Sequence, residues 1–500
     1  MKVVFRVDAS VWIGSGHVMR CLVLAEALKR VAYEVSFACL PQQGDMISYI
    51  KQRGHHVTKL TPVSPPMTPT DDADYLGWLQ RSVEQDALDF VKQVIKADVV
   101  VTDHYAIDAT WQGIVKQALI CRLVAIDDLN RVHDADCIID QTLGRKVEDY
   151  PGNATVLAGT NYALLGSDFS LYRARVADKS PPTSTPNVLI SMGGIDSPNA
   201  TLMVLKSLVG KVEATFTVLL SPRAPHYQKV VAWCAEYDSI THCDFSDNMA
   251  SLMTDHDVAI GAPGTTSWER ACLGLPSIII PLAENQKEIT VQLVKHKAAI
   301  ALTLNDIHQY IVSAFQKLLR EWAAYHRTNM ALCDGKGAQR VALSFQQQMS
   351  IIFPSDFELT LAISADIQLV FDWQCHPKTR QYALNPSVPS WEEHFSWMTM
   401  KLARVEDYFY IVKRRSSGLA VGVLRLDRQQ DMHFLVSIFV APDQHGQGVA
   451  SGALTLADVV HPNATLHATV LENNQASQHL FEKANYQRIS QKTFIRNPIT

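Results

Sequence analysis

The first 177 residues alternate short runs of β-branched residues with amphipathic helical stretches, and this alternation constrains the fold more than any other feature. Strands that alternate with helices pair in parallel, because each helix returns the chain to the same edge, and the helices then cover both faces of the sheet. The pattern predicts a Rossmann-like α/β domain over residues 1–177. Its expected strands are Lys2–Val7, Glu34–Cys39, Asp98–Thr102, Arg122–Ile126 and Cys137–Ile139.

A second Rossmann-like domain is predicted over residues 187–350, after a linker of proline and hydroxyl residues at 180–186. Two α/β domains joined by a linker place a cleft between them, which is a common position for small-molecule sites. A closing helix is expected over Lys336–Gln348. The expected strands are Asn187–Ser191, Ala214–Leu220, Val258–Ile260 and Ser277–Pro281.

Residues 357–500 have a different character, and the junction around Pro354 separates them from the rest. Two helical stretches come first and strands follow, a pattern typical of an α+β domain with a mostly antiparallel sheet. The helices are expected over Asp366–Thr379 and Ser390–Met400. The strands are expected over Tyr408–Val412, Ala420–Leu426, His433–Val440 and Ala464–Val470.

Composition narrows the class of protein. A net charge of -5 with both signs interspersed argues against nucleic-acid binding. Nine scattered cysteines without a CxxC pair indicate a reducing compartment. No stretch approaches the roughly 18 apolar residues of a membrane span, and the N-terminus lacks the apolar core of a signal peptide. We expect a cytoplasmic enzyme with small-molecule partners and without a metal; the oligomeric state stays open.

A glycine-rich turn, Gly14-Ser15-Gly16, follows the first strand and leads into a helix that begins with His17. Glycines permit tight backbone geometry, and the unpaired N–H groups of a helix start favour an anion. Imidazole is the side chain that most often serves as a base near neutral pH, although a lone histidine is more often structural. The turn therefore marks a candidate site.

Two further turns of this kind follow strands of the second domain, at Met192–Gly194 and at Gly261–Ser267. Their N–H groups and hydroxyls are suited to a diphosphate, and Glu269, in the first turn of the next helix, is suited to sugar hydroxyls. The alternative is that they are plain strand-to-helix turns. Two in one domain favour nucleotide binding.

Taken together, these motifs resemble one family over residues 1–350, the UDP-2,4-diacetamido-2,4,6-trideoxy-β-L-altropyranose hydrolases of pseudaminic acid biosynthesis. The resemblance rests on Gly14 to Arg20, Asp103-His104-Tyr105, Asp127-Asp128, Met192–Gly194, Gly264–Glu269 and Asp334–Gly337. It implies a GT-B-like fold, UDP held by the second domain, and inverting attack of water on the anomeric carbon. The catalytic residues that it implies are His17, Tyr105 and Asp103. The implied UDP-sugar-binding residues are Gly14, Gly16, Arg20, Gly193, Gly194, Gly264, Thr265, Thr266, Glu269 and Asn285.

The C-terminal segment resembles the GNAT acetyltransferases, through the turn from Val440 to Ala450, Asn474 and the run Leu480–Lys483. Phe371–Trp373 and Trp391–Phe395 resemble the branch that N-acetylates a UDP-4-amino sugar in the same pathway. The implied co-substrate is acetyl-CoA. The residues implied to bind it are Val440, Gln444, Gly446, Gly448, Val449, Ala450 and Asn474.

Two positions depart from the superfamily pattern: His445 replaces the usual Gln or Arg, and Phe481 replaces a frequent tyrosine acid. The acid is therefore unassigned, with Tyr486 more typical of a core aromatic. The base is open among His433, Glu392 and Glu393.

The function expected from both resemblances is a bifunctional enzyme. The C-terminal domain acetylates a UDP-4-amino sugar, and the N-terminal pair hydrolyses the UDP-diacetamido sugar. Two alternatives remain: a GT-B glycosyltransferase fused to an acetyltransferase, since the fold is shared, and a non-catalytic nucleotide-sugar sensor that regulates the GNAT domain.

Overall fold

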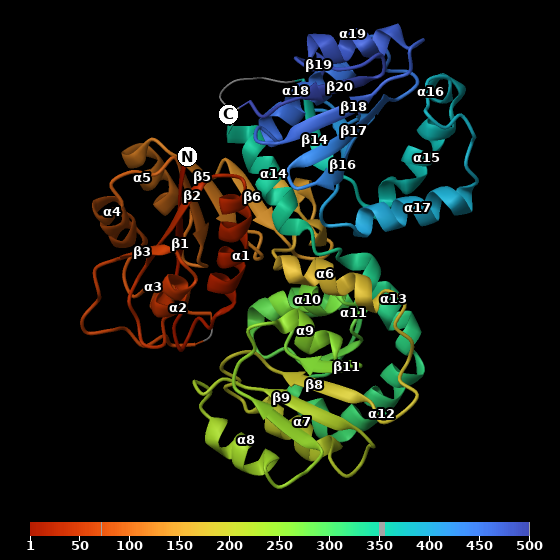
Figure 1. Cartoon of the computed structure of the whole chain (residues 1–500). Coiled ribbons are helices and arrows are strands. Elements are labelled where there is room, and N and C mark those ends of the chain that lie inside the picture. The colour runs from red at the N-terminus through yellow and green to blue at the C-terminus, as the bar shows by residue number, and fades with distance from the viewer. Residues whose placement is uncertain (72, 350–355, 500) are drawn as a thin grey trace. The chain divides into compact units, whose positions relative to one another are not determined.

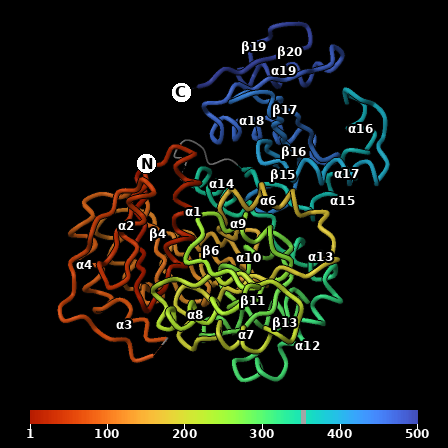
Figure 2. The backbone as a smooth tube through the Cα atoms, turned by 60° about the horizontal axis from the view of Figure 1, so that its bottom comes forward, coloured from red at the N-terminus to blue at the C-terminus, as the bar shows by residue number. Residues whose placement is uncertain are grey.

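The computed structural model describes residues 1–71, 73–349 and 356–499. The chain forms two compact units, residues 1–341 and 342–500 (Figure 1), and each is described by itself. The junction expected around Pro354 lies outside the described residues. The first unit holds two parallel sheets with their helices, which form separate lobes (Figure 2), and the second unit holds one largely antiparallel sheet.

The first lobe is a parallel sheet in the order β3-β2-β1-β4-β5-β6-β7. Its central strands β1 and β4 are buried at every residue except Lys2, as expected of a sheet covered on both faces. The strands are β1 Lys2–Val7, β2 Glu34–Cys39, β3 His56–Lys59, β4 Val99–Asp103, β5 Arg122–Ile126, β6 Cys137–Asp140 and β7 Thr155–Ala158. The helices are α1 Gly16–Arg30, α2 Ile47–Gln52, α3 Tyr75–Leu79, α4 Val83–Gln93 and α5 Ala109–Leu119.

The second lobe is a parallel sheet in the order β10-β9-β8-β11-β12-β13. Its strands are β8 Asn187–Ser191, β9 Thr215–Leu219, β10 Ile240–Cys243, β11 Val258–Gly261, β12 Ser277–Ile279 and β13 Ala299–Ala301. Its helices are α7 Ala200–Leu208, α8 Tyr227–Cys234, α9 Met249–Thr254, α10 Thr265–Cys272, α11 Lys287–Lys295, α12 Ile307–Arg320, α13 Trp322–Leu332 and α14 Gly337–Met349.

Helix α6, Ser167–Val176, precedes the linker in sequence but packs in the second lobe. Phe169 and Val176 lie in one apolar cluster with Trp268 and Ala271 of α10. Arg173 also donates to the carbonyl oxygens of residues 272, 330 and 333. The chain therefore crosses to the second lobe before the linker, while the domain limits at 177 and 350 stay predictions.

The second unit is a mixed sheet in the order β14-β15-β16-β17-β18-β20-β19. In the described part of the chain β17 and β18 pair in parallel, and the other neighbours are antiparallel. The strands are β14 Phe357–Leu361, β15 Tyr408–Arg414, β16 Ala420–Gln430, β17 His433–Val440, β18 Thr465–Thr469, β19 Gln487–Arg488 and β20 Thr493–Arg496. The helices are α15 Ile367–Cys375, α16 Pro377–Arg380, α17 Trp391–Ala403, α18 Val449–Val460 and α19 Gln475–Lys483.

The predicted architecture is confirmed: two Rossmann-like parallel sheets precede an α+β domain with a largely antiparallel sheet. The strands that the sequence did not single out are short or lie at sheet edges, where the apolar pattern is weak. They are β3, β7, β10, β13, β14, β19 and β20.

Helix α14 begins in the first unit and ends in the second. Near its start, Arg340 donates to both carboxylate oxygens of Asp334. Near its end, the buried Gln347 amide pairs with both main-chain groups of Leu359 in β14: it accepts from the N–H at 2.7 Å and donates to the carbonyl at 2.8 Å. Gln347 thus binds β14 as a neighbouring strand would.

We predict that Gln347→Ala destabilises the second unit by about 1–3 kcal/mol, because two buried main-chain groups lose their partner. Hydrogen exchange of the β14 amides should quicken accordingly. Gln316→Ala, at an exposed position of α12, is the matched control. Unchanged exchange in β14 would show that Gln347 contributes nothing to this strand.

Candidate functional site

The sequence-predicted residues of the first lobe meet at the carboxyl ends of β1 and β4. Because β1 lies between β2 and β4, the helices that follow β1 and β4 leave toward opposite faces, and a crevice opens at this switch point. His17 is the second residue of α1, the helix after β1, while Asp103 ends β4 and Tyr105 follows it. The fold therefore gathers residues that are far apart in sequence.

His17 is held by Asp103. The His17 Nδ1 lies 2.6 Å from Asp103 Oδ1, and since a carboxylate only accepts, the proton is assigned to Nδ1. The Nε2 atom then carries a lone pair, and no hydrogen bond to it is formed by the residues that the structure describes. His17 is 8% exposed and Asp103 1%. The imidazole is thus oriented and ready to accept a proton at Nε2.

Arg20, one turn further along α1, fixes the same carboxylate. Its Nε and Nη2 donate to the two oxygens of Asp103, each at 2.6 Å, and its Nη1 donates to Asp128 Oδ2 at 2.9 Å. Burial alone would raise the pKa of Asp103, but the Arg20 guanidinium and His17 together hold it below its usual range. Arg20 therefore keeps Asp103 ionised and fixes the orientation of its carboxylate, while the role predicted for Arg20 in binding the UDP-sugar stays a prediction.

Tyr105 forms one wall beside His17, with the two ring centroids 4.7 Å apart and edge to face. Burial and the Asp128 carboxylate raise its pKa well above the ordinary value, so the phenol stays protonated. Asn285, which follows β12 in the second lobe, donates to the Tyr105 hydroxyl at 3.4 Å. This contact brings a predicted substrate-binding residue of one lobe to a predicted catalytic residue of the other.

The glycines of the predicted turns face open space. A Cβ atom built on Gly14, Gly16, Gly193 or Gly264 would meet nothing within 4 Å, and on Gly194 it would meet only side chains at 3.5 Å or more. By contrast, a Cβ on Gly261 would lie 2.3 Å from the Ser191 carbonyl oxygen. Close packing therefore explains Gly261, whereas the other glycines leave open space beside the main chain. The N–H groups of Gly14 and Gly264 are engaged within the protein, by the Ser10 carbonyl oxygen at 3.0 Å and by Ser267 Oγ at 3.2 Å.

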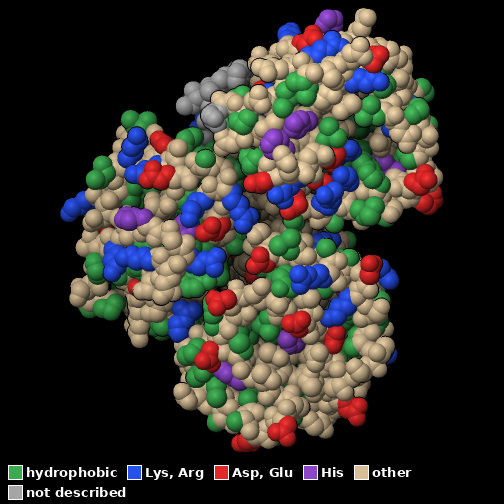
Figure 3. Space-filling view, viewed as in Figure 1, with side chains coloured by type: hydrophobic (Ala, Val, Ile, Leu, Met, Phe, Trp, Pro, Cys, Tyr) green, Lys and Arg blue, Asp and Glu red, His purple; other side chains and the backbone are tan. Residues whose placement is uncertain are grey.

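A cavity of about 270 Å³ lies between α1 and the second lobe. Arg20, Thr265 and Glu269 line it, and charged side chains of both signs gather where the two lobes meet (Figure 3). Thr266 is half-buried beside Thr265 in the first turn of α10. Burial raises the pKa of Glu269 to about 7, an effect that Arg270 partly offsets, and its Oε2 is buried without a hydrogen-bond partner in the described chain. The unpartnered Oε2 atom of Glu269 is suited to accept a hydrogen bond from a hydroxyl group.

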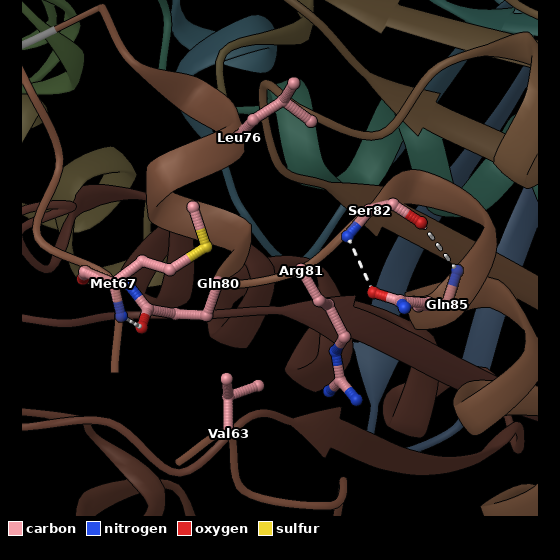
Figure 4. A pocket seen from close by; sticks show the side chains of 7 residues that line it. All are labelled: Val63, Met67, Leu76, Gln80, Arg81, Ser82 and Gln85. Atoms are coloured by element: carbon pink, nitrogen blue, oxygen red, sulfur yellow. Dashed lines mark hydrogen bonds between the residues drawn. The ribbon is translucent and has the colours of Figure 1, made fainter. Parts of the chain in front are cut away.

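A second hollow, of about 510 Å³, lies beside α3 (Figure 4) and holds none of the predicted site residues. Its wall is largely apolar, with Val63, Met67 and Leu76 facing Arg81. Ser82 and Gln85 are engaged in a reciprocal cap of α4 at 3.2 Å. We therefore place the candidate site at the switch points and not in this hollow.

Two aromatic residues that no sequence motif marks, Tyr75 and Trp78, pack against Tyr105. The ring of Tyr75 lies 5.0 Å from that of Tyr105 and the ring of Trp78 5.9 Å, both contributed by α3. Arg131 donates to the Tyr105 carbonyl oxygen at 2.5 Å. No local sequence signal marks these residues, because only the tertiary fold brings α3 to β4.

In the second unit the predicted coenzyme turn joins β17 to α18. Gly446 and Gly448 both have φ of +77°, a left-handed conformation that favours glycine, and open space lies beside each. Strand β17 pairs with β16 as far as Val440 but with β18 only as far as Val436. Strands β17 and β18 therefore separate next to the turn. Val449 and Ala450 begin α18, whose first N–H groups face a phosphate in such an arrangement.

Arg414 supports this turn from β15. Its Nη2 donates to Gln447 Oε1 at 2.7 Å and to Gln444 Oε1 at 3.3 Å, and its guanidinium stacks over the Phe357 ring at 5.3 Å. The turn is thus fixed by a side chain that sequence analysis did not identify.

The remaining predicted residues of this unit have structural partners. Asn474 caps α19 by accepting from the Ser477 N–H at 3.1 Å. Phe481 and Tyr486 both lie in the apolar core, which agrees with a core role for Tyr486. His433 stands at the start of β17, with its Nδ1 3.1 Å from His467 Nε2, at the opposite end from the glycine turn. The acid and the base of acetyl transfer stay unassigned.

Glu392 and Glu393 sit in the first turn of α17, on its exposed side. Glu393 completes a reciprocal cap with Ser390, accepting from its N–H at 2.8 Å.

Known proteins match both units. Residues 198–342 match the glycosyltransferase family 28 C-terminal domain and residues 357–487 the acetyltransferase (GNAT) domain. An uncharacterised protein of Methanocaldococcus jannaschii is 26% identical, over 98% of this chain and 97% of its own length. The UDP-2,4-diacetamido-2,4,6-trideoxy-β-L-altropyranose hydrolase of Campylobacter jejuni is 25% identical, over 59% of this chain and 97% of its own. The spore coat polysaccharide biosynthesis protein SpsG of Bacillus subtilis is 22% identical, over 50% and 77%.

The fold and these matches define the class: an enzyme in which a GT-B-like, nucleotide-sugar type of domain pair is fused to a GNAT acetyltransferase domain. Within that class, its first part is a homologue of the UDP-diacetamido-altropyranose hydrolase. The predicted resemblance and the predicted fusion are thus confirmed.

The described residues contain no helix that is both long and apolar enough to cross a membrane. They also contain no group of three or more His, Cys, Asp or Glu side chains placed to hold a metal ion.

We predict that Glu269 titrates near pH 7 in the ligand-free protein. A carboxyl whose pKa rises from 4.5 to about 7 on folding gives stability that is full below pH 4.5 and is lost as the pH rises through 7. Glu269→Gln, which stays neutral, should therefore gain stability relative to the wild type between pH 5 and pH 8. Melting temperatures measured across this range test the prediction, with Glu213→Gln, at an exposed position, as the control. Parallel curves for Glu269→Gln and wild type would refute it.

Proposed function

We propose that the chain is a bifunctional enzyme of nucleotide-sugar metabolism. The first unit hydrolyses UDP-2,4-diacetamido-2,4,6-trideoxy-β-L-altropyranose, and the second transfers acetyl from acetyl-CoA to the 4-amino group of its UDP-sugar precursor, as in pseudaminic acid biosynthesis. The observation that carries the first activity is the Asp103–His17 pair with a free Nε2. The second rests on the glycine turn after β17 and the match to the GNAT domain.

The hydrolytic step needs few groups, because UDP leaves readily without a general acid. A water held at His17 Nε2 attacks the anomeric carbon while its proton passes to that nitrogen. The bond from this carbon to the diphosphate oxygen breaks, and its electron pair stays on the diphosphate. The N–H groups of the Gly193, Gly194 and Gly264 turns and of the α10 start stabilise that charge. One direct displacement inverts the carbon.

The remaining predicted residues fit binding roles. Thr265, Thr266 and Glu269 take nucleotide hydroxyls and phosphate oxygens, and Asn285 with Tyr105 takes the sugar. Gly14 and Gly16 open the space beside His17. In the second unit, Gly446, Gly448, Val449 and Ala450 hold the coenzyme diphosphate, and Val440 with Gln444 flanks it. The nine unpaired cysteines support a reducing, cytoplasmic compartment.

A GT-B glycosyltransferase is the second candidate, favoured by the match to a glycosyltransferase domain. Product analysis separates the two. The full chain is incubated with the UDP-diacetamido sugar alone, and mass spectrometry follows UDP and free sugar. Release of both without an acceptor supports hydrolysis, whereas release that needs an acceptor favours the transferase. Tight UDP-sugar binding without turnover favours a sensor.

We predict that His17→Ala lowers hydrolytic turnover by about 10²–10⁴-fold, the usual loss for a positioned base. UDP affinity and acetyl transfer should change little, because the proposed diphosphate turns follow β8 and β11 of the second lobe and acetyl transfer is assigned to the second unit. His296→Ala, at an exposed position after α11, is the matched control. Near-native turnover of His17→Ala would show that another group activates water.

We predict that Gly448→Ala weakens acetyl-CoA binding about tenfold or more, because its methyl group strains a left-handed residue and enters the space that the diphosphate needs. Gly418→Ala is the matched control: its φ is +66° and open space also lies beside it, but it lies in the β15–β16 turn. Calorimetry measures both affinities. Equal effects of the two substitutions would mean that strain, not the ligand, accounts for the loss.

A further inference from the structure

Arg223 lies where the glycine turns of the two lobes approach each other. It follows β9, and its side chain extends past Gly194 of the second lobe toward Ser15 of the first. A Cβ built on Gly194 would lie 3.5 Å from Arg223 Nη2 and 3.8 Å from Ser15 Oγ. The guanidinium therefore stands between the turn after β8 and the turn that begins α1.

The guanidinium is anchored but not neutralised. Its Nε donates to Ser221 Oγ at 3.4 Å, and its Nη1 donates to the Gly44 carbonyl oxygen of the first lobe at 3.1 Å. Among the residues that the structure describes, no carboxylate forms an ion pair with it. By contrast, the half-buried Arg131 and Arg145 are paired with Asp127 and Asp140. A half-buried cation without a counter-charge is suited to an anionic ligand.

The turn beside Arg223 is open. Gly193 has a φ of +87° and nothing within 4 Å of its side-chain direction, and a Cβ on Gly14 or Gly16 of the first lobe would likewise meet nothing. The carboxyl ends of β8 and β11 meet here, because β8 lies between β9 and β11 and forms the switch point of the second sheet. The Gly193–Gly194 turn and a cation without a carboxylate partner among the described residues thus lie side by side at this switch point.

We propose that Arg223 binds the diphosphate of the nucleotide sugar, with Nη2 donating to a phosphate oxygen. This inference rests on the function proposed above and adds a residue that neither motif nor resemblance marks. When the bond to the anomeric carbon breaks, its electron pair remains on the diphosphate, whose charge grows by one. A cation at this place stabilises the departing diphosphate more than the bound substrate, so Arg223 serves turnover as well as binding.

The test compares the affinities of the full chain for UDP, UMP and uridine by calorimetry. Arg223→Gln should weaken UDP binding by about 10- to 100-fold, the range for a lost charge-assisted hydrogen bond. Uridine binding should stay within about twofold, and the loss for UMP should be smaller than for UDP. Arg320→Gln, at an exposed position of α12, should leave all three affinities unchanged. Circular dichroism and melting curves confirm that the variants are folded.

Arg223→Lys keeps the positive charge but lacks the planar set of guanidinium N–H donors, so it should recover part of the UDP affinity. An unchanged UDP affinity in Arg223→Gln overturns the proposal. Equal losses of affinity for UDP and for uridine also overturn it. They would show that Arg223 acts by holding Ser221 and Gly44 in place and not by binding the diphosphate. If the wild type binds none of the three ligands, the proposed function itself fails; if it binds UDP and only the Arg223 effect is missing, the function stands and this inference alone falls.

Discussion

The buried carboxylate of Asp103 is the group on which the candidate hydrolytic site depends. It receives hydrogen bonds from His17, from two nitrogens of Arg20 and from the Cys21 thiol, all in the first turns of α1. An ionised carboxylate buried this deeply persists only when paired, and Arg20 supplies the pairing charge. The same contacts fix the start of α1 against the end of β4. The hydrogen bonds of Asp103 therefore orient the imidazole of His17 and also hold the start of α1 against the end of β4.

The sequence predicted the strands and the glycine turns well, because both leave local signals. β1, β2, β5, β8 and β17 begin and end where their β-branched runs do. For the candidate site, the motifs predicted His17, Tyr105 and the glycine turns, and nothing beyond them. What the sequence lacked were contacts between remote segments: Tyr75 beside Tyr105, Arg223 beside Gly194, and Gln347 bonded to β14. Arginine, tyrosine and glutamine are common surface residues, so nothing local distinguishes them.

The glycines show why a motif alone is ambiguous. Gly261 and Gly264 stand three residues apart in one turn, yet a side chain on Gly261 would strike the Ser191 carbonyl oxygen and a side chain on Gly264 would meet nothing. The first glycine lets two strands approach, and the second leaves open space beside the start of α10. Sequence gives both the same letter. Only the surrounding backbone separates a packing requirement from a binding one.

The two proposed diphosphate sites rely on the same physical means on unrelated sheets. In the first, parallel strands end at switch points and helix starts follow them; in the second, β17 separates from β18 and the left-handed Gly446 and Gly448 lead into α18. Both proposals assign the phosphate oxygens to main-chain N–H groups, which bind them without demanding a net positive protein. A chain with a net charge of -5 can therefore bind two anionic ligands. Where a positive side chain contributes, it needs to lie at the site itself. Arg223 is such a cation in the first unit, whereas Arg414 in the second is engaged by glutamine oxygens and fixes the turn itself.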